Sequence, residues 1–271
     1  MRPIAHTALY ALVLVALLLG VAQSNPSLAQ TPSPSPQAAP PAPAFLSVTI
    51  VKVRPEMMGE FQNYMKNTTN PALRKGGLKW REVWQSTIAS GDNFEFVIVA
   101  PVDKFADFDG PSALERALGG DGFAAWSAKA GSFVTHVHRY IVRTRPDLSH
   151  MGKRTGPPKL AVVSSVHVAN NRNMEFESFI KNDWMPVMAQ GGATYLVVQT
   201  IFGGDANEYI TLTMRENFAE LDKGPVPVQV LGNDAAQKLL MKVPAGAVTQ
   251  LVRNVVRLVP ELSILPAEMP K

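Results

Sequence analysis

Two pairs of segments repeat each other along this chain, and no other feature limits its fold as strongly. FQNYMKNTTNPALRKGG (61–77) and FESFIKNDWMPVMAQGG (176–192) share Phe, Lys, Asn, Pro and Gly-Gly at a constant shift of 115 positions. THVHRYIVRTRPDLS (135–149) and TQLVRNVVRLVPELS (249–263) share Thr, Arg, Val, Arg, Pro, Leu and Ser at a shift of 114 positions. Because the order and the spacing of these matches agree, we predict tandem copies of one module.

Each copy is predicted to have the order β-α-β-β-α-β. β-branched segments indicate strands, apolar residues at helical spacing indicate the first helix, and Gly with Asp or Asn indicates a hairpin turn. The predicted segments are first strands at 46–53 and 161–168, hairpins at 80–100 and 194–214, short helices at 102–130 and 215–242, and final strands within 135–149 and 249–263.

This order is that of the ferredoxin-like fold, in which helices cover one face of an antiparallel sheet. The other face stays exposed unless a second sheet packs against it, and a duplicated chain supplies both sheets. We therefore predict an α+β protein with two tandem ferredoxin-like β-α-β-β-α-β units whose antiparallel sheets pack as a pseudo-dimeric α/β barrel.

The beginning of the chain is typical of an export signal. Arg2 is followed by an apolar run over 8–21, which is shorter than the roughly 20 residues that span a bilayer as a helix. Cleavage after Ala22 or Ala29 would leave no membrane span, and a periplasmic or secreted location in a bacterium is expected. The 271-residue chain contains no Cys, which excludes disulfides and thiolate chemistry.

The predicted organisation follows from the repeat and from composition. The uncharged, Pro-rich stretch before residue 45 is expected to be a disordered spacer. The predicted parts are a signal peptide at 1–29, a Pro-rich linker at 30–44, a first repeat at 45–150, a linker at 151–158, a second repeat at 159–265 and a tail at 266–271.

The repeated unit resembles the dimeric α/β-barrel superfamily, which contains antibiotic-biosynthesis-type monooxygenases and NIPSNAP-like proteins. The resemblance rests on the element order, the Gly-Gly after the first helix and the Phe-Ala-(Asp/Glu)-(Phe/Leu)-Asp run at 105–109 and 218–222. It implies that one chain supplies a barrel that other members build from two. It also implies that an enzyme of this type would oxidise a small aromatic substrate without a cofactor.

Histidines offer one candidate site. His136 and His138 alternate on one face of a predicted final strand, and His167 lies in a strand that should neighbour a final strand. The second copy has Gln250 and Val252 at the matching places, so we predict no metal. The two final-strand histidines remain candidates for ligand binding.

Recurring polar residues offer a second candidate site. Arg139 and Arg253 recur in the final strands, and guanidinium groups suit a carboxylate or a phosphate. The alternative is a structural ion pair in each unit, with Glu95 and Glu208 as the partners. The sequence favours the ion pairs because both copies retain them.

Glutamine and tryptophan complete the candidates. Gln85 and Gln199 recur in the first hairpin strand, where they could bind a ligand or pair with neighbours in the sheet. Trp84 has no counterpart in the other copy, and an aromatic side chain there could line an apolar pocket or fill the core. The sequence identifies no catalytic residues.

The composition limits the classes of function. The net charge of +4 and the pI near 9.3 come from scattered basic residues, and together with export they argue against nucleic acid. Gly-rich phosphate loops, Gly-x-Ser-x-Gly, His-Glu-x-x-His and calcium loops are absent from the sequence. Three hypotheses remain: a binding module for a small apolar or aromatic ligand in the barrel, a cofactor-independent monooxygenase-like enzyme, and a structural or interaction protein with a filled barrel. Assembly into an oligomer is compatible with each.

Overall fold

The computed structural model describes residues 44–152 and 158–265. The predicted signal peptide, nearly all of the Pro-rich linker, most of the central linker and the predicted tail lie outside the described residues. Within the described ranges, no helix is both long and apolar enough to cross a membrane.

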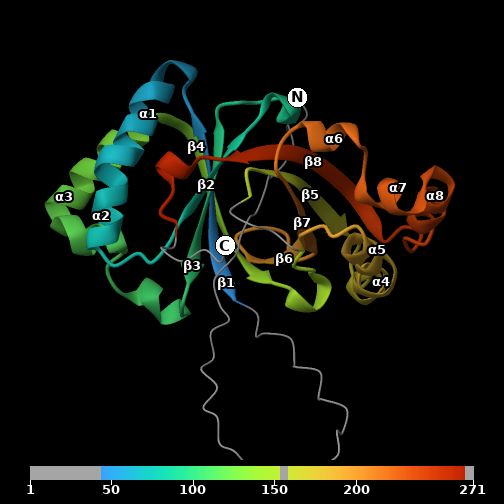
Figure 1. Cartoon of the computed structure of the whole chain (residues 1–271). Coiled ribbons are helices and arrows are strands. Elements are labelled where there is room, and N and C mark those ends of the chain that lie inside the picture. The colour runs from blue at the N-terminus through green and yellow to red at the C-terminus, as the bar shows by residue number, and fades with distance from the viewer. Residues whose placement is uncertain (1–43, 153–157, 266–271) are drawn as a thin grey trace, which may run out of the picture.

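Eight strands form a closed, fully antiparallel barrel in the order β1-β3-β2-β8-β5-β7-β6-β4 (Figure 1). The strands are β1 (Phe45–Val53), β2 (Glu82–Ser86), β3 (Glu95–Val102), β4 (Val134–Thr144), β5 (Leu160–Val168), β6 (Tyr195–Phe202), β7 (Glu208–Arg215) and β8 (Val248–Leu258). Each half of the chain contributes four neighbouring strands in an equivalent order. The order is β4-β1-β3-β2 in the first half and β8-β5-β7-β6 in the second half. The two sets join where β2 meets β8 and where β4 meets β6.

Helices lie on the outside of the barrel, in one group for each half of the chain (Figure 1). The helices are α1 (Met58–Tyr64), α2 (Asn70–Lys75), α3 (Ala113–Ser132), α4 (Asn173–Phe179), α5 (Met185–Gln190), α6 (Ala219–Asp222), α7 (Val226–Leu231) and α8 (Asn233–Leu240). A π-helical turn joins α1 to α2 (Met65–Thr69), and another joins α4 to α5 (Ile180–Trp184). In both halves Gly-Gly ends the second of these helices, with Gly77 and Gly192 at positive φ.

The buried side chains form three apolar clusters. One cluster draws on all eight strands and therefore fills the inside of the barrel, with Trp84 fully buried in it. We call the cluster between the first sheet and its helices the first layer; it includes Phe61, Phe96, Phe133 and Leu262. We call the cluster between the second sheet and its helices the second layer; it includes Leu148, Phe176, Phe179, Tyr195, Tyr209 and Val226. Side chains alternate between the inside and these layers along each strand.

The segment after the last strand of each half crosses to the other half. His150 bridges to Tyr195 and Leu148 is buried in the second layer, although both His150 and Leu148 belong to the first half. Leu262, from the end of the second half, is buried in the first layer in return. A serine fixes each crossing segment: Ser149 Oγ accepts from the Val197 amide at 2.9 Å, and Ser263 Oγ accepts from the Val83 amide at 2.9 Å. The halves thus exchange their ends.

The predicted α/β barrel of antiparallel strands is confirmed, with one shortened strand. The first hairpin strand was expected to extend over the region 80–89, but β2 covers only Glu82–Ser86. A 3-10 turn at Ile88–Ser90, followed by Gly91 at φ 77°, ends the strand early.

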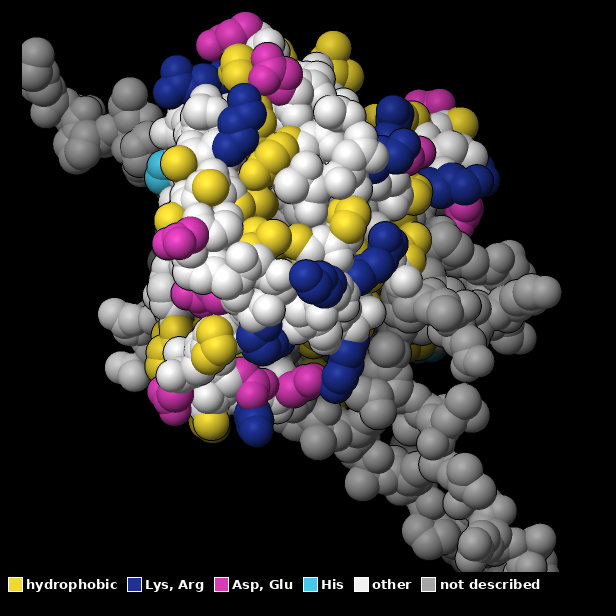
Figure 2. Space-filling view, turned by 90° about the vertical axis from the view of Figure 1, so that its left-hand side faces the viewer, with side chains coloured by type: hydrophobic (Ala, Val, Ile, Leu, Met, Phe, Trp, Pro, Cys, Tyr) yellow, Lys and Arg dark blue, Asp and Glu magenta, His cyan; other side chains and the backbone are white. Residues whose placement is uncertain are grey.

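The surface carries charges of both signs. On the face formed by α1, α2 and α3, Lys and Arg side chains alternate with Asp and Glu, and apolar side chains lie singly or in small groups (Figure 2). Ion pairs such as Lys79–Asp103 (2.7 Å) and Lys129–Glu60 (3.5 Å) lie on this side of the molecule. Mixed charges of this kind are typical of an ordinary solvated surface.

Candidate functional site

The inside of the barrel is packed with its own side chains. Trp84 lies there at 0% exposure, and its indole Nε1 donates to the Glu82 carboxylate at 3.0 Å. Burial raises the pKa of Glu82 to about 7. The expected small ligand inside the barrel would have to displace this apolar cluster.

The histidine candidates do not converge on a metal-binding group. His138 stacks on Tyr140 with ring centroids 5.6 Å apart, and His136 is exposed. His167 instead contacts Asp205, with 3.1 Å between Nδ1 and the carboxylate. Among the residues that the structure describes, no group of three or more side chains could hold a metal ion.

The predicted ion pairs of Glu95 with Arg139 and of Glu208 with Arg253 are wrong. Arg139 lies opposite Thr49 on the outer face of the sheet and donates to its hydroxyl at 3.1 Å, whereas Glu95 shares the inner face with Val97 and Val99. Arg253 is likewise exposed on the outer face. Glu208 points inward and accepts hydrogen bonds from Ser165 and Thr200 instead.

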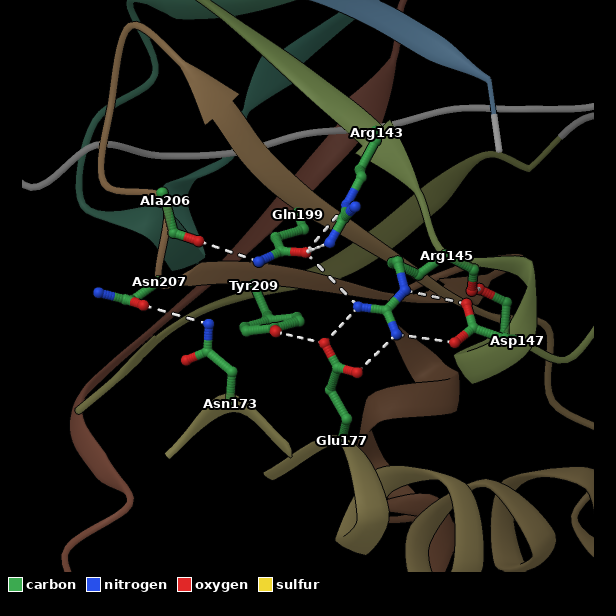
Figure 3. Close-up of polar contacts among 10 residues, drawn as sticks. Arg143, Arg145, Asp147, Asn173, Glu177, Gln199, Ala206, Asn207 and Tyr209 are labelled. Carbon is green, nitrogen blue, oxygen red and sulfur yellow. Dashed lines mark hydrogen bonds and ion pairs between the residues drawn. The ribbon is translucent and has the colours of Figure 1, made fainter. Parts of the chain in front are cut away.

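One of the predicted residues, Gln199, belongs to a dense polar network at the edge of the second layer (Figure 3). Arg143, Gln199 and Tyr209 lie side by side on β4, β6 and β7 because the strand register pairs each with the next. Gln199 Oε1 accepts from Arg143 Nε at 3.0 Å and from Arg145 at 3.5 Å, while its amide donates to the Ala206 carbonyl at 3.0 Å. We call Arg143, Arg145, Asp147, Glu177, Gln199 and Tyr209 the Arg145 network.

Arg145 is the centre of this network. Its guanidinium binds both oxygens of Asp147, at 2.9 and 2.7 Å, and both oxygens of Glu177, one of them at 2.7 Å. The Tyr209 hydroxyl donates to Glu177. Arg145 comes from the crossing segment of the first half, whereas Glu177 lies on α4 and Tyr209 on β7, so both halves build the network.

The charges in the network hold each other in their ionised forms. The hydrogen bond from Arg145 is the main cause that lowers the pKa of Glu177, and the same holds for Asp147. Burial, followed by the hydrogen bond to Glu177, raises the pKa of Tyr209. At neutral pH Glu177 is therefore a carboxylate and Tyr209 a neutral phenol whose hydrogen points at that carboxylate.

The matching place at the first layer keeps Gln85, Arg257 and Glu261 but lacks the counterparts of Arg145, Glu177 and Tyr209. Phe96 stands at the position of Tyr209, next to Gln85 in the register as Tyr209 is next to Gln199. Phe61 packs on Phe96 with centroids 5.0 Å apart, as Phe176 packs on Tyr209 at 5.1 Å, and the residues that follow Phe61 and Phe176 are Gln62 and Glu177.

The counterpart of Arg145 is Val259, and it occupies the same backbone position. The Val259 amide donates to Val83 at 2.8 Å, as the Arg145 amide donates to Val197 at 2.8 Å. Gln85 keeps the sheet contact, from its amide to the Asn93 carbonyl at 2.8 Å, and within the described residues it accepts no hydrogen bond from an arginine. The charged contacts therefore converge at the second layer, whereas the first layer has Val259, Gln62 and Phe96 at the matching positions.

Arg145, Asp147, Glu177 and Tyr209 were not among the residues predicted from the sequence. Arg139, Arg253, Gln85 and Gln199 were candidates because both halves retain them. The useful signal was a difference between the halves, because Arg145 corresponds to Val259 and Glu177 to Gln62. Asp147 gives no such signal, since Glu261 matches it. Ligand binding by Arg139, Arg253, Gln85, His136, His138 and Trp84 stays a prediction, since the structure places none of them in the Arg145 network.

Comparison with models of protein families finds no match, and comparison with curated proteins finds none either. Solved structures do match. A monooxygenase candidate from Lactobacillus acidophilus has a TM-score of 0.52 at 11% identity, over 80% of this chain and 93% of that one. An anthrone oxidase-like protein has a TM-score of 0.53 at 12% identity, over 83% and 97%. Chlorite dismutase from Candidatus Nitrospira defluvii in complex with imidazole has a TM-score of 0.51 at 9% identity, over 80% and 92%.

These likenesses extend over most of both chains, but the identities are low, so they concern the fold alone. The topology and the structural neighbours agree on one conclusion. The chain has the fold of the dimeric α/β-barrel proteins.

Proposed function

We propose that this chain is an exported enzyme of the oxygenase type that oxidises a small aromatic molecule at the Arg145 network. The observation that carries the proposal is the one-sided placement of the network, because a site that served only the fold would be expected in both halves. The names of the structural neighbours, a monooxygenase candidate and an anthrone oxidase-like protein, support the class of reaction. The apolar run at 8–21 supports export.

The proposal includes the origin of the barrel. Two ferredoxin-like units, similar to those of NIPSNAP-like proteins, would have fused in tandem after duplication. The constant shifts between repeated segments and the equal strand order of the two halves support this origin. Assembly of the chain into an oligomer stays a prediction.

The chemistry assigns a positioning role to Tyr209. Tyr209 is fully buried and its hydroxyl donates to Glu177, so it holds this carboxylate in place. The Glu177 side chain is 26% exposed and can accept a hydrogen bond from an acidic C–H or O–H group of the substrate. Partial removal of that hydrogen makes the substrate richer in electrons and easier for O2 to oxidise. In the reaction, a CH2 group of an aromatic ketone becomes C=O, one oxygen atom of O2 enters the product and the other leaves as water with the two hydrogens.

Oxygen uptake with anthrone as the probe tests this function. The full mature chain is expected to consume O2 and to form the corresponding quinone, identified by mass spectrometry. Tyr209→Phe, which installs the residue of the first half, is expected to slow the reaction about five- to tenfold, since one hydrogen bond contributes on the order of 1–1.5 kcal/mol. Phe96→Tyr is the matched control and should leave the rate unchanged. Equal rates in the wild-type protein and in Tyr209→Phe would contradict the role of Tyr209.

A binding protein without chemistry is the second candidate. It is favoured by the ion pairs of Arg145, whose guanidinium already has two carboxylate partners, Asp147 and Glu177. In that case anthrone would bind without O2 uptake, and the network would only hold the wall of the binding site in place.

A further inference from the structure

Arg143 is the cation of the Arg145 network without a carboxylate partner. Within the described residues it forms no ion pair, whereas Arg145 forms two. Its guanidinium is half-buried and donates through Nε and Nη2 to the neutral amide oxygen of Gln199. A charge withdrawn from water usually has an opposite charge beside it, and a neutral amide supplies only part of that stabilisation.

Gln199 holds Arg143 in a way that leaves one edge of the guanidinium available. An arginine has five N–H donors in a planar fork, and the contact to Gln199 uses the edge formed by Nε and Nη2. The end formed by Nη1 and Nη2 retains a pair of parallel donors. That pair fits the two oxygens of a carboxylate.

The β2–β8 junction shows what the same arginine does where no ligand is expected. Arg257 of β8 occupies the matching register position beside Gln85, but it is exposed and its guanidinium lies over the Phe218 ring, 5.6 Å from the centroid. The contact between this arginine and the glutamine amide is thus found at the β4–β6 junction, which carries the Arg145 network.

We propose that the Arg145 network takes an aromatic substrate that bears a carboxylate, held end-on by Arg143. This inference rests on the proposed function and names its substrate class. Gln199 acts as a positioning residue that orients the guanidinium. Gln199 and Tyr209 are buried, so a carboxylate at Arg143 would place the aromatic ring over the open edge of the network, toward the partly exposed Glu177.

Isothermal titration calorimetry with 2-naphthoate and its uncharged analogue 2-naphthamide tests the substrate class on the full mature chain. Wild-type protein is expected to bind 2-naphthoate about ten- to hundredfold more tightly than 2-naphthamide, the range for a hydrogen bond to a charged group. Arg143→Met is expected to abolish that preference while 2-naphthamide still binds. Arg257→Met, the matched control at the β2–β8 junction, should keep the preference.

Three results would overturn the inference. Equal affinity for both probes, or no binding of 2-naphthoate, removes the carboxylate from the substrate class. A preference that is lost in Arg257→Met but kept in Arg143→Met moves the anion to the β2–β8 junction. The anthrone assay separates this inference from the proposed function, because anthrone has no carboxylate. O2 uptake with anthrone together with any of these results would leave the proposed function standing and would reject only the substrate class.

Misfolding of the variant is recognised with the second probe. A misfolded Arg143→Met would fail to bind 2-naphthamide as well as 2-naphthoate.

Discussion

At the scale of single residues, the Arg145 network shows how one substitution changes the chemistry of a layer. Glu177 replaces the Gln62 of the first half, and it does so only where Arg145 replaces Val259. Without Arg145, a carboxylate at the edge of an apolar layer would lose its hydration with no compensating charge. The charges of Glu177 and Arg145 therefore depend on each other.

The pairing predicts how stability depends on pH. Because the folded-state pKa of Glu177 is lowered, its contribution is fully present above the ordinary carboxyl pKa of about 4.3 and is lost as the pH falls through the folded-state value. We expect Glu177→Gln to lower the free energy of unfolding at pH 7 by about 1–3 kcal/mol, with a difference from wild type that shrinks below about pH 4. Urea unfolding at a series of pH values measures both quantities.

Glu175→Gln on the same helix is the control for this prediction. Glu175 forms an exposed ion pair with Arg172, and exposed pairs contribute at most about 1 kcal/mol. If the two variants gave the same loss at pH 7, the special role of Glu177 would be refuted.

At the scale of helices and strands, the sequence predicted what local patterns determine. Periodicity and turn residues located the eight strands, and Gly-Gly marked the ends of α2 and α5. The ion pair predicted for Glu95 and Arg139 was wrong because the two residues lie on opposite faces of the sheet. Their faces depend on the register of β1 with both β3 and β4, which no local pattern gives. The contact of Arg145 with Glu177 joins residues of different halves, and no local pattern encodes it.

The turn between β6 and β7 offers a test of close packing between elements. Gly203 has φ 80°, and a Cβ there would lie 2.7 Å from the Arg139 carbonyl oxygen on β4. Gly91 has φ 77°, and a Cβ added to it would have no atom within 4 Å. The left-handed backbone lowers the free energy of unfolding of both Ala variants by roughly 1–2 kcal/mol. Gly203→Ala is expected to lose at least about 1 kcal/mol more than Gly91→Ala in thermal or urea unfolding, because the β6–β7 turn must also move away from β4. Equal losses would mean that the turn does not press on β4.

At the scale of the whole molecule, the exchanged ends make the two halves one folding unit. Leu148 is 1% exposed in the second layer and Leu262 is 2% exposed in the first, and each is contributed by the opposite half. A half separated from its partner would lose this side chain from its layer and would expose the inner face of its sheet.

Separate expression of the halves tests this unity. Residues 44–152 and 158–271 produced as two polypeptides are each expected to lack a cooperative unfolding transition, and a mixture of both should regain one. As a finer measure, Leu148→Ala and Leu262→Ala in the intact chain should each lower the free energy of unfolding by about 2–5 kcal/mol. A cooperative transition in either isolated half would show that the exchanged ends are dispensable.

The crossing of Arg145 into the other half also has a genetic consequence. In a barrel made of two identical chains, one codon would specify the positions of both Arg145 and Val259, and any charge introduced at one interface would appear at the other. A single gene that encodes both halves separates these codons. The Arg145 network is an asymmetry that an identical pair could not acquire without acquiring it twice.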